Sequence, residues 1–179
     1  MNRLINIILL TTNIYLHPAF TLTSPAFKHQ DYIPSRYTCD GSNISPELAW
    51  SGEPNKTKTY ALVVDDPDAP GKIWVHWVVF NIPGDTHELQ EGVAQGDFVL
   101  GSTDFSEAQV GSSLSYDGSQ SYGGPCPPFG EHRYQFTLYA LDAKLDLAAG
   151  ASKKEVVAAM RGHILAQTTL VGRYKRIKK

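Results

Sequence analysis

The chain has few of the residues and motifs that would assign it to a well-known class of enzyme. Its 179 residues include only two cysteines, Cys39 and Cys126, and neither has another cysteine or a histidine at the spacing of a zinc site. It contains no His-Glu-x-x-His metal motif and no Gly-x-Ser-x-Gly nucleophile motif. We therefore expect no metal and no cofactor. Export would allow the cysteines to form one disulfide, whereas the cytosol would keep two thiols, and the sequence alone does not decide.

Basic side chains are scarce outside the C-terminus. The chain has 16 Lys and Arg against 18 Asp and Glu, and residues 173–179 hold five of the basic side chains and no acidic one. The remaining body is a poor surface for nucleic acid, because neutralising phosphates requires clustered Lys and Arg on the docking face. We expect no nucleic-acid partner and interpret residues 173–179 as a solvated basic tail.

A long apolar run is also missing. Leu4 to Leu16 follows Arg3 and carries no charge, but it is shorter than the about 20 apolar residues that cross a bilayer. Such a run is typical of a secretory signal peptide, so we predict a signal peptide at residues 1–19 and no transmembrane segment. Residues 20–179 would form one domain, periplasmic or secreted. A cytoplasmic protein with a disordered or packed N-terminus is the alternative.

Short apolar segments between turn residues predict a mainly β fold. Strands are expected at residues 20–22, 60–64, 74–80 and 134–141, which are rich in β-branched and aromatic side chains. Both faces of the third strand are apolar, which indicates a central, buried strand. One face would carry Trp74, His76, Val78 and Phe80, and the other Val75, Trp77 and Val79.

One helix is predicted after residue 151. Ser152 and Glu155 have the spacing of a capping box, in which each side chain bonds the other residue's backbone N–H. Apolar residues follow at helical spacing and would pack on the sheet: Val156, Val157, Met160, Ile164 and Leu165. His163 would lie in this helix, partly exposed, and we assign it no chemistry.

An acidic turn beside a histidine in an apolar strand is the strongest local signal of function. Burying the imidazole of His76 is costly without a partner, and the nearest candidates are Asp66 and Asp68. Taken alone, such a turn is more often a structural Asx turn than part of a site.

A second histidine, His132, follows a glycine-rich and proline-rich segment at residues 122–130. Backbone N–H groups near Gly124 and imidazole donors suit phosphate oxygens, while a carboxylate can orient an imidazole or accept from an ammonium group. These residues predict a site for a phosphate, including one joined to an amine. The same His and Asp residues would serve a hydrolase, but no serine lies in a recognisable nucleophile context.

Seven motifs occur in order along residues 20–174: 32–41, Ile44-Ser45-Pro46, Asp65-Asp66-Pro67-Asp68-Ala69-Pro70, Val75-His76-Trp77, Asn81-Ile82-Pro83, 122–128 and His132-Arg133-Tyr134. Together they resemble the phosphatidylethanolamine-binding protein family, and most closely its bacterial Raf kinase inhibitor-like branch. The resemblance implies two packed, largely antiparallel sheets with a few peripheral helices and an anion pocket at one end.

The resemblance also implies the residues of the pocket. Carried over position by position, they are Asp66, Asp68, His76, Gly124, Cys126, Pro127 and His132. His76 and His132 would donate to the anion, Gly124 would offer its N–H, and the two aspartates would orient the imidazoles. A disulfide between Cys39 and Cys126 would fix the pocket loop.

The expected function is non-enzymatic binding of a phosphorylated small molecule, such as a phosphoethanolamine-like head group. The alternative is an inhibitor of a protease or kinase that acts through the pocket rim and the loop at residues 104–122, and a hydrolase is a third hypothesis. A homodimer stays open.

Overall fold

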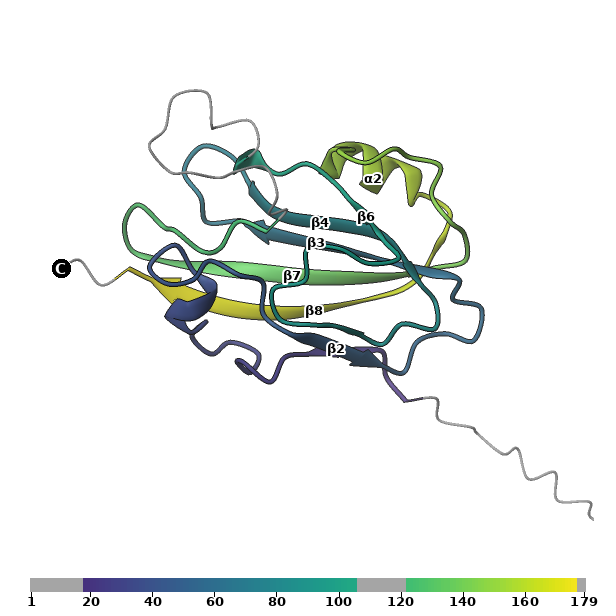
Figure 1. Cartoon of the computed structure of the whole chain (residues 1–179), viewed down its shortest axis with the longest axis horizontal. Coiled ribbons are helices and arrows are strands. Elements are labelled where there is room, and N and C mark those ends of the chain that lie inside the picture. The colour runs from purple at the N-terminus through teal and green to yellow at the C-terminus, as the bar shows by residue number, and fades with distance from the viewer. Residues whose placement is uncertain (1–17, 106–121, 177–179) are drawn as a thin grey trace, which may run out of the picture.

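Two antiparallel sheets packed face to face make up the body of the protein (Figure 1). The computed structural model describes residues 18–105 and 122–176. The strand order is β1-β2-β5 in the smaller sheet and β6-β4-β3-β7-β8 in the larger. The strands are β1 Thr21–Thr23, β2 Leu48–Ser51, β3 Thr59–Asp66, β4 Trp74–Pro83, β5 Glu88–Leu89, β6 Val99–Leu100, β7 Glu131–Leu141 and β8 Ile164–Lys175. The predicted mainly β, two-sheet architecture is confirmed.

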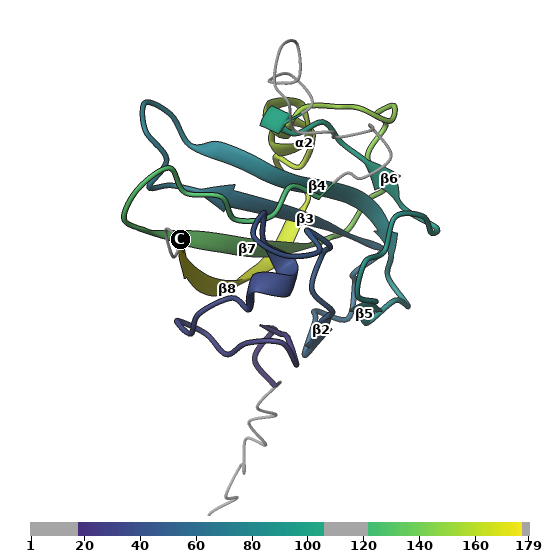
Figure 2. The ribbon, with the colours of Figure 1, turned by 60° about the vertical axis from the view of Figure 1, so that its left-hand side comes forward.

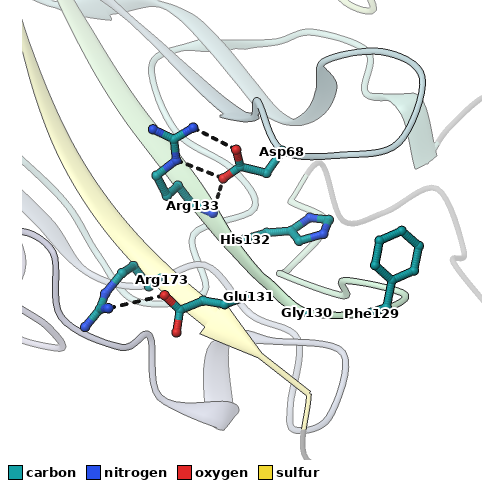
Figure 3. Close-up of a pocket in the computed structure, with 7 residues that line it drawn as sticks. All are labelled: Asp68, Phe129, Gly130, Glu131, His132, Arg133 and Arg173. Carbon is teal, nitrogen blue, oxygen red and sulfur yellow. Dashed lines mark hydrogen bonds and ion pairs between the residues drawn. The ribbon is translucent and has the colours of Figure 1, made fainter.

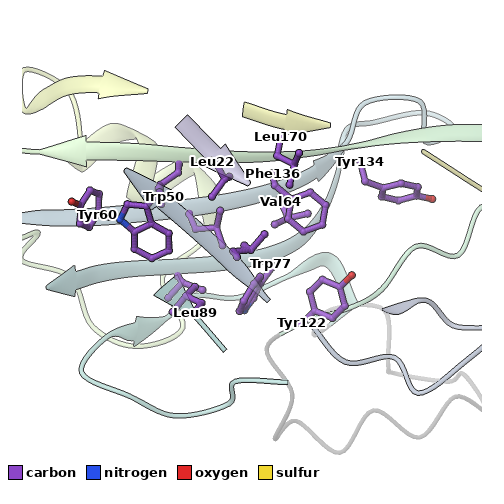
Figure 4. Close-up of a cluster of buried hydrophobic side chains, with 14 of the residues drawn as sticks. Leu22, Trp50, Tyr60, Val64, Trp77, Leu89, Tyr122, Tyr134, Phe136 and Leu170 are labelled. Carbon is purple, nitrogen blue, oxygen red and sulfur yellow. The ribbon is translucent and has the colours of Figure 1, made fainter. Parts of the chain in front are cut away.

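The core has two parts, one on each face of the larger sheet. Large side chains of both sheets, including Trp50, Trp77 and Phe136, fill the space between them (Figure 4). On the other face, the helix α2, Lys153–Ala159, covers Val78 and Phe80. Figure 2 shows α2 and β2 on opposite sides of the larger sheet. β4 is therefore buried on both faces, as its sequence predicts.

A β-bulge in β4 changes the predicted faces of that strand. Val64 of β3 pairs with Trp77, but the next residue, Asp65, pairs with Val75, so His76 is an extra residue without a partner on β3. The alternation of side chains is shifted at this point. Val75 consequently packs with Val78 on the helix side, and the prediction that it shares a face with Trp77 is wrong.

The helix begins where predicted but ends earlier. The Ser152 side chain accepts from the Glu155 N–H, and the Glu155 side chain accepts from the Ser152 N–H, which completes the capping box. Helix α2 ends at Ala159, and Gly162 has a φ of 82° in the turn that follows. The placement of residues 163–165 in the helix is wrong. His163 lies in the turn, and Ile164 and Leu165 begin β8, where they are 43% and 36% exposed.

The described part of the predicted basic tail, residues 173–176, is structured, and residues 177–179 lie outside the described residues. β8 continues to Lys175, so residues 173–175 belong to the larger sheet. Arg173 pairs with Glu131 at 3.2 Å, and Arg176 pairs with Asp40 at 2.9 Å. The interpretation of the C-terminus as a solvated tail is therefore wrong for residues 173–176.

Two predicted segments lie mostly outside the residues that the structure describes. Nearly all of the predicted signal peptide and residues 106–121 of the predicted partner loop lie outside the described residues. Within residues 18–105 and 122–176, no helix has the length and apolar character needed to span a bilayer.

Candidate functional site

The predicted site residues meet at one end of the larger sheet. β3 ends at Asp66, β4 begins at Trp74, β7 begins at Glu131 and β8 ends at Lys175. Because neighbouring strands are antiparallel, these four strand ends lie at the same edge, on the left in Figure 1. The helical turn η1, Ser35–Tyr37, lies nearby, and the segment after it contacts the loop that precedes β7. Residues more than 60 positions apart in the chain are thus brought together.

Asp66 and His132 form a buried, hydrogen-bonded pair at the centre of this end. The Asp66 Oδ2 lies 2.7 Å from the His132 Nδ1, and both side chains are 5% exposed. Since a carboxylate only accepts, the imidazole donates from Nδ1. The other carboxylate oxygen accepts the Asp68 N–H at 2.9 Å, in an Asx turn. Asp66 therefore orients one imidazole, His132, and leaves its Nε2 for another partner.

His76 takes a different partner from the one predicted. Its Nδ1 lies 2.5 Å from the carbonyl oxygen of Gly123, and the Gly123 N–H donates back to the His76 carbonyl at 2.9 Å. Neither Asp66 nor Asp68 bonds to this ring, so that prediction is wrong. Burial lowers the pKa of His76 to about 4. The ring is consequently neutral at pH 7, with its proton on Nδ1, and Nε2 is an acceptor.

Asp68 accepts hydrogen bonds from Arg133 and not from a histidine. Its Oδ2 accepts from the backbone N–H and Nε of Arg133 at 2.9 and 2.8 Å, and its Oδ1 accepts from an outer nitrogen at 2.7 Å. The hydrogen bonds from Arg133 hold the pKa of Asp68 at about 2. The predicted role of Asp68 in orienting a histidine is therefore wrong.

The loop before β7 is fastened to the segment that follows η1. Cys39 and Cys126 form a disulfide, and the Cys39 N–H donates to the Pro125 carbonyl at 3.1 Å. The Gly124 N–H donates to the Asn43 Oδ1 at 2.8 Å. Because that donor is already used, the predicted role of Gly124 as an anion donor does not fit. Pro127 is buried and Cys126 half-buried in the same loop.

Gly124 is required for the fit of this loop. A Cβ at this position would lie 2.5 Å from the Tyr37 carbonyl oxygen and 2.9 Å from the Thr38 Cα, both backbone atoms that cannot rotate away. We predict that Gly124→Ala lowers the free energy of unfolding by about 2–3 kcal/mol, as overpacking does, measured by urea denaturation.

Gly130→Ala is the matched control for the loop, because nothing lies within 4 Å of a Cβ at that position. Its φ of 70° adds only a local backbone cost. Equal destabilisation by the two substitutions would contradict the close fit of Gly124.

Several residues at this end were not identified from the sequence. An open cavity of about 440 Å³ is lined by Asp68, Phe129, Gly130, Glu131, His132, Arg133 and Arg173 (Figure 3). Tyr134 is also missing from the predicted set. Its ring packs against His76 at 5.1 Å between centroids, its hydroxyl is buried, and burial raises its pKa. The period of two along β7 from His132 is the signal that would have found it.

The site carries acid and base groups. In the described part of the chain, no group of three His, Cys, Asp or Glu side chains is arranged to hold a metal ion. A carboxylate-oriented imidazole that lines a solvent-open cavity can bind an oxyanion.

Comparisons with known proteins agree with this fold. The family model described as phosphatidylethanolamine-binding protein matches residues 23–175. A UPF0098 protein from Methanothermobacter thermautotrophicus is 51% identical over 87% of this chain and 98% of its own length. A crystal structure of a phosphatidylethanolamine-binding protein homolog from Chlamydia trachomatis is 37% identical, with a TM-score of 0.77 over 89% of this chain and 99% of that one. YbcL from E. coli, described as a new member of the mammalian PEBP family, is 31% identical, with a TM-score of 0.76 over 88% of this chain and 99% of its own.

Proposed function

Because the chain belongs to the phosphatidylethanolamine-binding protein family, we propose that it binds a small phosphate-bearing anion beside His132. The supporting observation is the buried pair of Asp66 and His132, whose imidazole lines a cavity open to solvent. Asp66 accepts from Nδ1 and fixes the orientation of the ring, which places Nε2 to donate to an oxygen of the anion.

His76 sets a condition on the ligand. As a neutral ring with an unprotonated Nε2, it accepts a hydrogen bond and does not donate one. A ligand that reaches this atom must carry a proton of its own. The singly protonated form of a phosphate monoester has both oxygens that accept from His132 and a hydroxyl that donates to His76. In this arrangement His132 donates and His76 accepts, which differs from the sequence-based prediction that both histidines donate to the anion.

Binding without catalysis explains the same residues better than hydrolysis does. A hydrolase of the His and Asp type needs a nucleophile beside the imidazole. Among the described residues, no serine, threonine or cysteine side chain hydrogen-bonds His132, and Cys126 is held in the disulfide. We propose a non-enzymatic role on this basis.

Titration of the protein with inorganic phosphate, followed by NMR of the histidine rings, tests the proposal. We expect saturable shifts of the His132 and His76 signals at millimolar phosphate. His163 should not move, because it lies at the opposite end of the larger sheet, where it pairs with Asp142. If the His132 signal shows no saturable shift at about 10 mM phosphate, the free energy of binding is weaker than about −3 kcal/mol. This result would contradict the proposed function.

The substitution Asp66→Asn isolates the carboxylate that orients His132. Loss of a charge-assisted hydrogen bond should weaken phosphate binding about 10- to 30-fold. Asp142→Asn is the matched control, since Asp142 holds the Nδ1 of an exposed histidine at 2.9 Å and should not affect binding.

A further inference from the structure

His76 is closed off from the open cavity that His132 lines. It is 3% exposed, and it is not among the described residues that line the cavity. We infer that Phe105 is a positioning residue that covers the imidazole of His76, and that Asp104 holds Phe105 in place. The inference rests on the proposed function, because it concerns the access of the same ligand to His76.

The ring of Phe105 lies directly against the residue that His76 bonds. A Cβ on Gly123 would lie 2.2 and 2.3 Å from two carbons of the Phe105 ring, so glycine is needed for the ring to come this close. The carbonyl oxygen of the same glycine accepts from the Nδ1 of His76 at 2.5 Å. The rings of Phe105 and His76 meet edge to face, with centroids 5.1 Å apart and planes at 67°. Phe105 therefore packs on both members of this hydrogen bond.

Phe105 is the outer layer of the packing around this imidazole. Of the two described aromatic rings that contact His76, Tyr134 is buried and Phe105 is half-buried. Gly123, the hydrogen-bond partner, is buried as well. Trp74 is half-buried and packs on Phe105, with ring centroids 5.7 Å apart. Loss of the Phe105 ring would therefore open the imidazole to water, because this ring is the cover that reaches the surface.

Two hydrogen bonds fix Asp104, the residue before Phe105. Its Oδ2 accepts from the backbone N–H of Val75 at 2.7 Å, and its Oδ1 accepts from the Nζ of Lys72 at 2.6 Å. The carboxylate is only 12% exposed, and hydrogen bonds to a charged acceptor are stronger than neutral ones. Asp104 and Val75 are the chain neighbours of Phe105 and His76. The bond between them therefore holds the two rings together.

The cover also keeps water from His76. Burial is the largest cause of the low pKa of this imidazole. The charged and titratable groups that face it are Asp66 of β3, Asp104 after β6, and His132 and Tyr134 of β7. Replacing Phe105 by alanine removes part of the burial and none of these groups. The variant therefore isolates the effect of the cover on the pKa of His76.

Two measurements on the full chain test the inference without any ligand. The first is an NMR titration of His76, whose pKa should rise by about one unit in Phe105→Ala as the ring gains water. The second is the rate at which diethyl pyrocarbonate acylates the unprotonated nitrogen of each histidine at pH 7, followed by peptide mass spectrometry. In the wild type, His76 should react about 10-fold more slowly than the exposed His163. In Phe105→Ala, the rate at His76 should rise about 5-fold or more.

Three further variants complete the test. Phe105→Leu keeps an apolar cover and should restore both measurements to near their wild-type values. Phe129→Ala is the matched control, since it removes an exposed ring that packs on His132, and it should leave His76 unchanged. Asp104→Ala should raise the rate at His76 about 3-fold or more, because the cover loses its anchor. The rate is the measurement for this variant, since loss of the negative charge and gain of water change the pKa in opposite directions.

The outcomes separate this inference from the proposed function. If His76 reacts as fast as His163 in the wild type, or if Phe105→Ala changes neither its rate nor its pKa, the inference is overturned whether or not phosphate binds. An equal rise in Phe129→Ala would also overturn it, because the effect would not be specific to the cover. If the variants behave as expected but phosphate causes no saturable shift of His132, the proposed function is wrong and Phe105 is a cover of His76 alone.

Discussion

Replacing both cysteines by serine should lower the free energy of unfolding by about 4–5 kcal/mol, the value that chain entropy gives for a closed loop of nearly 100 residues. Cys39 and Cys126 are 87 residues apart, so their bond restricts a large part of the unfolded chain. Urea denaturation of the oxidised protein and of the double variant Cys39→Ser/Cys126→Ser would measure the difference. Both residues are half-buried, which limits the change in packing.

Reduced wild-type protein is the natural control, because it lacks the bond but keeps both sulfur atoms. It should unfold at about the same urea concentration as the double variant. A loss below about 1 kcal/mol would contradict the prediction, because contacts in the folded loop cannot replace the restriction of the unfolded chain.

Acidification should destabilise the protein by about 3 kcal/mol through His76, since a pKa difference of one unit corresponds to 1.36 kcal/mol. Burial lowers the pKa of His76 from 6.5 to about 4 in the folded protein. The unfolded chain therefore binds more protons between these two pH values. The contribution is fully present above pH 6.5, is lost progressively as the pH falls towards about 4, and changes no further below that.

The difference between wild type and His76→Gln isolates this contribution. The free energy of unfolding of the variant, measured at pH 4, 5.5 and 7.5, should fall less steeply with acid. Asp68 titrates below this window, because Arg133 holds its pKa at about 2. His163→Gln is the control, since it removes an exposed histidine. A wild-type slope in His76→Gln would show that other groups cause the acid sensitivity.

The sequence predicted the strands whose side chains carry strong patterns. β3, β4 and β7 contain runs of apolar and β-branched residues that favour a strand, and the capping box marked the start of α2. β8 was missed because its first residues continue a helical spacing from Met160. Pairing with β7 over the whole strand, from Glu131 with Lys175 to Leu141 with Ile164, overrides that local preference. The two-residue strands β5 and β6 have no pattern of their own and form only against their neighbours.

The sequence predicted which residues form the site better than it predicted the hydrogen bonds between them. Asp66 and His132 were found together, but the partners of His76 and Asp68 were assigned wrongly. The geometry of the chain brings His76 to the Gly123 carbonyl and Asp68 to Arg133. The bulge directs His76 to the loop carbonyl, and the alternation of β7 turns Arg133 away from His132 and towards Asp68. A motif names the residue types at a site, whereas the hydrogen bonds follow from the register of the strands.

The bulge in β4 also makes the length of this strand a fixed property of the protein. Deleting one residue between Asp66 and Trp77 within the paired region would remove the extra position opposite the link between Val64 and Asp65. If the residue deleted is His76, Val75 would follow Trp77 directly in regular alternation and would keep its pairing with Asp65, but the imidazole would be lost from the Gly123 carbonyl. Insertions and deletions are usually tolerated between strands, but here the loss of a single residue inside a strand would leave the core packing in register and still remove one side chain from the candidate site.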